Sequence, residues 1–254
     1  MGTIFQDGVN EVDLSSFKIH DGLSGKIWDK DATLKRDVRL ELLDIADNFI
    51  NEIGFDLEVE DIVLCGSICN YNWSYESDID LHILVDYKGL DDNIELVTAF
   101  FKTKKQEWCE SHDIRIKGFD VEVYVQDTSE EPKSGGVYSL NTDKWLKKPT
   151  KDDFSNFDYD NKQVSDVCDE VIDFVQVLQD RFERCDGDKY VSRKVNDYTQ
   201  RLIDTLITLR RKGLAKNGES SLCNLAYKAL RRNSAIDKLF DLNAKSYDAI
   251  HSID

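Results

Sequence analysis

The sequence lacks the features that mark a membrane-bound, secreted or disordered chain. No apolar run approaches the roughly 18 residues that a membrane-spanning helix needs. The segment MGTIFQDGVNEVD lacks a basic stretch followed by an apolar one, and Gln6 stands where the myristoylation pattern requires Ser or Thr. Hydrophobic residues make up 41% of the 254 residues, which is typical of folded globular proteins. We therefore expect a cytoplasmic protein without membrane contact.

A disulfide framework and a zinc site are also not expected. The six cysteines are scattered, and without a secretion signal they are interpreted as reduced thiols. Cys65 and Cys69, with Cys109 and His112, could supply four zinc ligands. However, Cys65 ends an apolar run, and these spacings do not match a recognised pair of zinc knuckles.

Positive charge is scarce, and its distribution is uneven. The net charge is −17, which disfavours broad nucleic-acid binding because such binding needs a basic surface. Residues 1–159 hold 17 basic and 34 acidic residues, whereas residues 160–254 hold 16 of each. Within the second part, residues 189–232 hold 11 basic and 3 acidic residues. This region is either an ordinary solvated helical surface or the one place where an RNA end would bind.

The first half of the chain alternates helical and strand patterns. Residues 35–53 place their apolar side chains on one helical face, and residues 92–110 do the same. Three runs are rich in β-branched residues and predict strands, at 61–65, 78–85 and 114–126. We therefore predict a small mixed α/β domain over residues 35–150, preceded by an N-terminal arm over residues 1–34.

The second half of the chain predicts helices only. Residues 127–160 are polar and turn-rich, so we interpret them as a connection. Helical periodicity then recurs in four segments, at 162–185, 189–213, 219–232 and 235–250. We expect a C-terminal helical domain over residues 160–254.

The chemistry-bearing residues cluster around the second predicted strand, which opens Asp78-Ile79-Asp80. Side chains at i and i+2 of a strand share a face, so both carboxylates project together. Two such carboxylates repel each other unless a cation lies between them. Two divalent ions about 3.5–4 Å apart would clamp the attacking and leaving oxygens of a phosphoryl displacement. Magnesium fits best because it prefers oxygen ligands and shares its shell with phosphates.

Two further parts complete this constellation. A third carboxylate is offered by Glu122, which is flanked by valines within the third predicted strand, with Asp120 as the alternative. Gly66 would let the backbone approach a phosphate closely, and the Ser67 hydroxyl and amide could donate to its oxygens. An Asp-x-Asp pair alone is usually a solvated strand face, and a Gly-Ser pair is usually a turn. The combination of the Gly-Ser pair, the Asp-x-Asp pair and a third carboxylate, in this order and spacing, is far more specific for a site that binds metal and phosphate.

The stretch GSICNYNWSYESDIDLHI (66–83), together with FDVEVYV (119–125), resembles the DNA polymerase β-like nucleotidyltransferase superfamily. With GVYSL (136–140) and GESSLCNLAYKALRR (218–232), the chain more narrowly resembles predicted nucleotidyltransferases encoded by tailed bacteriophages. The likeness to the superfamily covers about residues 35–126, and the narrower one covers most of the chain.

This resemblance implies an α+β fold, in which a small mixed-sheet catalytic domain is followed by a helical bundle with a cleft between them. It implies that Asp78, Asp80 and Glu122 bind magnesium, two ions being expected and manganese a possible substitute. Gly66 and Ser67 would hold the triphosphate of ATP or another nucleoside triphosphate. The implied reaction transfers a nucleoside monophosphate to a hydroxyl and releases pyrophosphate, in the host cytoplasm if the chain is phage-encoded.

The resemblance also implies a function for the basic region of residues 189–232. On the helix predicted over 219–232, Asn224, Lys228 and Arg231 are expected to form one polar stripe, opposite an apolar face that includes Leu222. Relatives use a basic residue from a helical domain on the triphosphate, which implies that Lys228, assisted by Arg231, contacts the β and γ phosphates. The alternative for these residues is an ordinary solvated face.

Several choices stay open from sequence alone. The acceptor is a small molecule, a protein hydroxyl or an RNA end, and the overall charge does not favour nucleic acid. A cyclic or oligonucleotide signal synthase and a catalytically silent virion or host-interaction protein are the alternative functions. His82 either orients a ligand carboxylate or fills the rim of the site. The loop aromatics Tyr71, Trp73 and Tyr75 either stack on a base or pin the loop.

Overall fold

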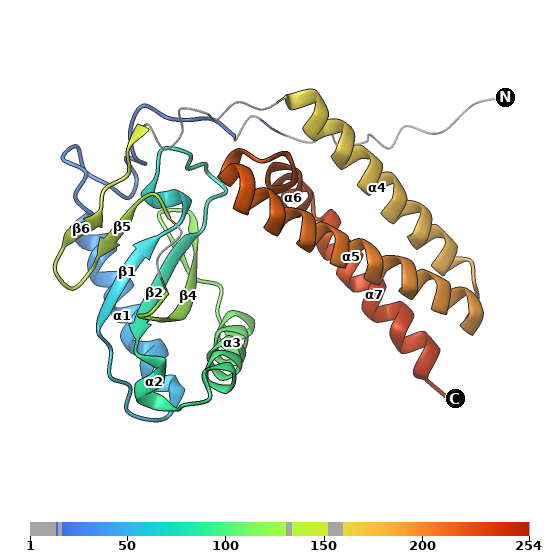
Figure 1. The fold of residues 1–254 in the computed structure, drawn as a ribbon, viewed down its shortest axis with the longest axis horizontal. Coiled ribbons are helices and arrows are strands. Elements are labelled where there is room, and N and C mark those ends of the chain that lie inside the picture. The colour runs from blue at the N-terminus through green and yellow to red at the C-terminus, as the bar shows by residue number, and fades with distance from the viewer. Residues whose placement is uncertain (1–13, 15–16, 131–133, 152–159, 254) are drawn as a thin grey trace. The chain divides into compact units, whose positions relative to one another are not determined.

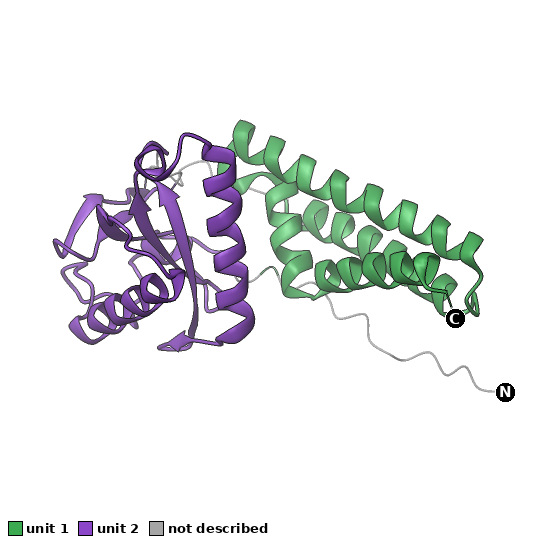
Figure 2. Cartoon of the chain, turned by 90° about the horizontal axis from the view of Figure 1, so that it is seen from below, with its two compact units in different colours: residues 1–15, 157–254 green, residues 16–156 purple. Residues whose placement is uncertain are grey.

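The computed structural model describes residues 14, 17–130, 134–151 and 160–253. The chain divides into two compact units (Figure 2). The sheet unit lies within residues 16–156, and the helical unit comprises residues 157–254 together with the N-terminal 15 residues. The predicted α+β class, a mixed sheet followed by helices, is confirmed.

The sheet unit is built on a curled mixed sheet with the strand order β3-β4-β2-β1-β5-β6 (Figure 1). Strands β2 and β4 pair in parallel, and every other neighbouring pair is antiparallel. A parallel pair needs a long crossover, and the connection containing helix α3 supplies it. The strands are β1 (Asp61–Cys65), β2 (Ile79–Val85), β3 (Arg115–Ile116), β4 (Phe119–Asp127), β5 (Val137–Ser139) and β6 (Lys144–Lys147).

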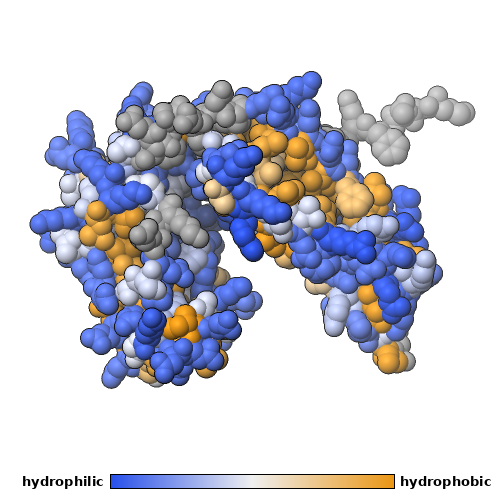
Figure 3. Space-filling view, in the orientation of Figure 1, coloured by the Kyte–Doolittle hydropathy of each residue, from blue (hydrophilic) through white to orange (hydrophobic). Residues whose placement is uncertain are grey.

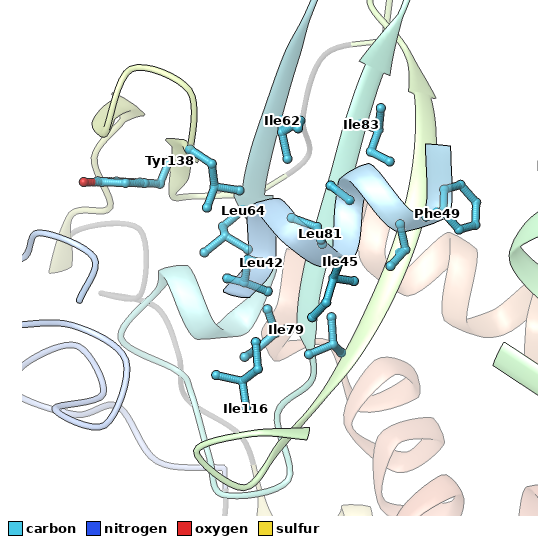
Figure 4. Close-up of a cluster of buried hydrophobic side chains, with 14 of the residues drawn as sticks. Leu42, Ile45, Phe49, Ile62, Leu64, Ile79, Leu81, Ile83, Ile116 and Tyr138 are labelled. Atoms are coloured by element: carbon cyan, nitrogen blue, oxygen red, sulfur yellow. The ribbon is translucent and has the colours of Figure 1, made fainter. Parts of the chain in front are cut away.

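The core of the sheet unit lies between the sheet and helix α1 (Arg36–Ile53). Leu42, Ile45 and Phe49 of α1 are buried against alternate residues of β2, as Figure 4 shows. Along β2 the buried residues Ile79, Leu81, Ile83 and Val85 alternate with half-buried ones, so one face of the strand is apolar and the other carries Asp80 and His82. Burying each such apolar side chain contributes about 1.5–3 kcal/mol, which fixes the register of β2 and hence the position of Asp80.

Two further helices belong to the sheet unit, α2 (Tyr87–Leu90) and α3 (Ile94–Ser111). Phe101 and Trp108 of α3 join the core, and Trp108 meets Phe49 edge to face with ring centroids 5.4 Å apart. Asn93 caps the first turn of α3 by accepting from the Leu96 N–H group. The same helix carries Lys105, which faces β4.

The structure departs from the sequence prediction in three places. The connection predicted over 127–160 contains strands β5 and β6. The strand predicted over 114–126 is the hairpin β3–β4, turned at Lys117 and Gly118, which have φ angles of 54° and 90°. Part of the predicted N-terminal arm, residues 17–34, belongs to the sheet unit, where Ile27, Trp28 and Leu34 are buried in the core.

The helical unit consists of α4 (Asn161–Glu183), α5 (Lys189–Asn217), α6 (Leu222–Arg232) and α7 (Ala235–His251), in agreement with the four predicted helical segments. Asp160 and Asp188 cap α4 and α5 by accepting backbone N–H groups. Figure 3 shows apolar side chains gathered between α4 and α5, with hydrophilic ones around them. Its core includes a cluster of Val175, Ile203 and Leu239 and a cluster of Leu178, Val195 and Leu242.

Among the helices of the described ranges, none is both long enough and apolar enough to cross a membrane.

Candidate active site

Gly66 lies at the turn between β1 and the short 3₁₀ helix η1 (Ser67–Cys69), directly against the carboxylate of Asp80. Its φ angle is 75°, a conformation that favours glycine. A Cβ atom at this position would lie 1.8 Å from Asp80 Oδ2. The antiparallel register of β1 and β2, which pairs Cys65 with Asp80, produces this close approach. Glycine is therefore required here for both its backbone angle and its lack of a side chain.

The carbonyl group of Gly66 is held from two sides. Asn70 Nδ2 donates to it at 2.6 Å, and Ser134 Oγ lies 3.4 Å from it. The Asn70 amide also donates to Ser134 Oγ at 3.1 Å, which links the turn to the segment leading into β5. The first N–H groups of η1 have no partner within that helix, and such groups form anion-binding concavities in many proteins. The conformation of the turn is thus fixed by hydrogen bonds from Asn70 and Ser134.

The Ser67 hydroxyl pins the loop that leads to Asp78. It donates to Ser77 Oγ at 2.8 Å, and Ser77 Oγ in turn accepts from the Ser74 N–H group at 2.9 Å. Trp73 holds the same loop, since its indole N–H donates to the Gly22 carbonyl at 2.9 Å and its ring stacks on His20. Tyr75, by contrast, is 71% exposed. The sequence allowed the loop aromatics either to stack on a base or to anchor the loop, and Trp73 anchors the loop.

Asp80 and Glu122 are neighbours across the parallel pair β2–β4, where they occupy the same register position. Residues in register on adjacent strands project from the same face of the sheet. Asp78 immediately precedes β2, and all three acidic residues are half-buried. The structure thus brings together Gly66, Asp80 and Glu122. Asp78 lies two residues before Asp80 in the sequence.

Tyr124 lies close enough to all three carboxylates for their charges to affect its pKa. Burial raises the pKa of Tyr124 well above its ordinary value, and its hydrogen bond to Glu122 raises it further. The negative charges of Glu122, Asp80 and Asp78 act in the same direction. The phenol therefore stays protonated and serves as a hydrogen-bond donor beside the acidic group.

Glu122 is engaged by two donors that the sequence did not predict. Lys105 of α3 forms an ion pair with Glu122 Oε2 at 2.8 Å, and the Tyr124 hydroxyl donates to the same oxygen. The Lys105 ammonium also lies 3.5 Å from the centroid of the Tyr124 ring. We call Lys105, Glu122 and Tyr124 the Glu122 clamp. No sequence signal pointed to Lys105, which lies on a helix with two other lysines, Lys102 and Lys104.

Asp120, the alternative third carboxylate, has a different environment. Its side chain is 54% exposed and forms an ion pair with Arg115 Nε at 2.6 Å across the β3–β4 hairpin. Glu122, at 31% exposed, stands beside Asp80 instead. The geometry thus favours Glu122 over Asp120 as a partner of Asp80.

His82 lies on the same face of β2, two residues beyond Asp80. Gln126 Nε2 donates to the Glu130 carbonyl, which leaves Gln126 Oε1 to accept from His82 Nδ1 at 2.6 Å. Burial lowers the pKa of His82, and the positive charge of Lys105 lowers it further, against the opposing effect of the Gln126 hydrogen bond. His82 is therefore a neutral imidazole with its proton on Nδ1.

Lys228 and Arg231 lie on α6 of the helical unit. Lys228 Nζ forms an ion pair with Glu219 Oε2 at 2.5 Å. The predicted polar stripe on this helix is wrong for Asn224, which is fully buried, and Leu222 on the predicted apolar face is 36% exposed. The Asn224 side chain donates to the Glu219 carbonyl at 2.9 Å and accepts from Arg210 Nε at 3.3 Å. Contact of Lys228 and Arg231 with phosphates stays a prediction.

Within the described ranges, no group of three or more His, Cys, Asp or Glu side chains is arranged to hold a metal ion. A scan against protein-family models, a search of curated proteins and a search of solved structures found no match to this chain.

Proposed function

We propose that the chain is a magnesium-dependent nucleotidyltransferase whose site comprises Gly66, Ser67, Asp78, Asp80 and Glu122. The observation that carries the proposal is the contact between the Gly66 backbone and the Asp80 carboxylate. A turn that offers N–H groups to a phosphate thereby adjoins a carboxylate that suits a metal ion, so one triphosphate could bind to both.

The donor set fits magnesium in its chemistry. Asp78 and Asp80 offer hard carboxylate oxygens, the ligands that magnesium prefers. Glu122 adds a third carboxylate on the adjacent strand, although its Oε2 atom accepts from Lys105 and Tyr124. Asp78 and Asp80 would hold the metal together with triphosphate oxygens. Glu122 would become a further ligand if the metal replaced Lys105 or Tyr124 at its Oε2 atom. When bound, the metal would lower the pKa of the attacking hydroxyl and neutralise the leaving pyrophosphate.

The proposed reaction is an in-line displacement at the α-phosphorus of a nucleoside triphosphate. The oxygen of an acceptor hydroxyl forms the new bond to phosphorus, while the bond to the bridging oxygen of the β-phosphate breaks. Glu122 takes the proton of the hydroxyl, and pyrophosphate leaves. The Gly66–Ser67 turn positions the triphosphate through its N–H groups, and Tyr124 holds the Glu122 carboxylate in place. The acceptor and the preferred base are not specified by these residues.

A nucleotide-binding protein without catalysis is the second candidate. It is favoured by the Glu122 clamp, because two donors on one carboxylate oxygen make that oxygen a poorer base and a poorer metal ligand. Both candidates predict magnesium-dependent binding of a nucleoside triphosphate, and only the first predicts chemistry.

Incubation with nucleoside triphosphates labelled on the α-phosphate separates the two candidates. Each of the four nucleotides is supplied with magnesium, alone, with RNA and with cell lysate. Label that moves into a small product, RNA or protein supports the enzyme and identifies the acceptor class. A magnesium-dependent thermal shift without any transfer of label supports the silent alternative, and the absence of both rejects the proposed site.

A further inference from the structure

The solvent-facing side of helix α5 carries tyrosines interleaved with basic residues. With 3.6 residues per turn, two tyrosines and four basic residues of α5 fall within an arc of about 80°, which Thr205 and Thr208 share. The opposite side of the helix is buried, through Val195, Thr199 and Ile203. We call the tyrosines and basic residues the α5 stripe, which consists of Tyr190, Lys194, Tyr198, Arg201, Lys212 and Lys216.

Every residue of the α5 stripe is exposed. Tyr190 is 67% exposed and Tyr198 is 44% exposed, so both rings are accessible to a ligand. The Lys194 ammonium lies 5.7 Å from the centroid of the Tyr190 ring. Tyr198 is supported edge-on by Phe174 of α4, with ring centroids 6.3 Å apart. The aromatic rings are thus held on the surface with charged groups beside them.

The charge of this surface contrasts with that of the chain. The whole protein has a net charge of −17, yet the stripe contains four basic residues and no acidic one. Asp197 and Asp204 lie along one border of the stripe. From Tyr190 to Lys216 the stripe extends about 39 Å at a rise of ~1.5 Å per residue. The four basic side chains are thus spread along the helix, with Thr205 and Thr208 between Arg201 and Lys212.

We propose that the α5 stripe binds single-stranded nucleic acid. The basic side chains complement the regularly spaced phosphates of a strand, and the exposed tyrosines offer faces on which unpaired bases stack. A duplex hides those faces, so single strands should bind better than duplexes. This proposal goes beyond the proposed function and does not depend on it, because binding is measured without metal or nucleoside triphosphate.

The test measures the fluorescence anisotropy of a labelled single-stranded RNA and a labelled single-stranded DNA, titrated with the full chain at low salt. The triple variant Lys194→Gln/Arg201→Gln/Lys212→Gln should weaken binding about tenfold or more. The double variant Tyr190→Leu/Tyr198→Leu should weaken it about fivefold or more through lost stacking. In wild type, a plot of the logarithm of the association constant against the logarithm of the salt concentration should have a slope of about −3. This slope corresponds to ~0.7 for each of four neutralised phosphates.

A matched control removes the same charge elsewhere. Lys102, Lys238 and Lys245 are exposed and lie outside the stripe, so their triple change to Gln should leave the affinity within about twofold. Circular dichroism checks that each variant is folded. The proposal is overturned if wild type does not bind single strands, if the stripe variant binds as wild type does, or if the control weakens binding equally. An unchanged affinity in the tyrosine variant, or equal binding of a duplex, would overturn the single-strand specificity.

Discussion

The backbone of Gly66 touches the carboxylate of Asp80 so closely that no side chain fits between them. This contact joins the turn after β1 to the strand that carries the proposed metal ligand. It depends on the pairing of Cys65 with Asp80 and on the left-handed backbone of Gly66.

Gly66→Ala should destabilise the sheet unit and abolish nucleotide binding. Gly54 is a control for a positive φ angle alone, because its φ of 90° is joined to a ψ of 8° and nothing lies within 4 Å of a Cβ there. Gly54→Ala should cost only the left-handed backbone term, about 1–2 kcal/mol. Gly66→Ala should cost about 1–3 kcal/mol more, because its φ of 75° with a ψ of −165° is essentially confined to glycine and because the new Cβ would displace the Asp80 carboxylate. Urea unfolding followed by tryptophan fluorescence measures both, since Trp28, Trp73, Trp108 and Trp145 all lie in the sheet unit. Equal losses would show that the contact is not tight.

Lys105→Gln should strengthen metal binding if Glu122 takes part in it. Removing the ammonium group leaves the carboxylate without its ion pair and more available to a cation. Because the pair is partly exposed, the gain should be modest, about two- to fivefold in affinity. Manganese binding followed by electron paramagnetic resonance, without nucleotide, measures it. Lys104→Gln is the control, since Lys104 pairs with Glu107 instead. Weaker or unchanged binding in Lys105→Gln would exclude Glu122 from the metal site.

Glu219→Gln should lower the stability of the helical unit at neutral pH but not in acid. Burial raises the pKa of Glu219, but the charge of Lys228 and the hydrogen bonds from Lys228 and Asn224 outweigh it and hold the pKa below its ordinary value of 4.5. For a carboxyl group with a lowered pKa, the stabilisation is present above the ordinary pKa and is lost as the pH falls through the lowered one. Unfolding followed by far-ultraviolet circular dichroism at several pH values should show wild type and variant converging below about pH 4.5. A pH-independent difference would contradict this role of the ion pair.

Asn224→Ala should destabilise the helical unit at all pH values near neutrality. The Asn224 side chain is fully buried and satisfies the Glu219 carbonyl and the Arg210 guanidinium. Its removal takes a hydrogen-bond partner from the part-buried Arg210 guanidinium and from the Glu219 carbonyl, which costs about 0.5–1.5 kcal/mol for each bond. Asn217→Ala, at an exposed position, should change the free energy of unfolding by less than about 0.5 kcal/mol. A loss of similar size in both variants would mean that the buried network contributes nothing specific.

The sequence predicted those elements whose periodicity is long and regular. Helix α1 and the four C-terminal helices have clear apolar faces, and the alternation in β2 placed Asp80 opposite the core. Strands β5 and β6 were missed because three- and four-residue strands are too short to show a period. The hairpin at Gly118 was also missed, although a glycine within a strand pattern is a known sign of a turn or bulge.

The candidate site was predicted in its acidic residues but not in their partners. Asp80 and Glu122 follow from strand alternation, since each interrupts an apolar run. Lys105 could not be found, because its contact with Glu122 depends on how α3 packs beside β4 and not on any local pattern. Asn224 was misplaced because its polarity suggested exposure, whereas a buried amide is tolerated when its hydrogen bonds are satisfied.

The transfer of α-labelled nucleotide by wild type, Asp80→Asn and Asp120→Asn tests the central claim most directly. Asp120 lies on β4 two residues before Glu122 but is exposed and paired with Arg115, so it is a matched control for charge and position. We predict magnesium-dependent transfer by wild type and Asp120→Asn at similar rates, and a loss of about a hundredfold or more in Asp80→Asn. Transfer by Asp80→Asn at the wild-type rate, or no transfer by wild type with any nucleotide and acceptor, would contradict the claim.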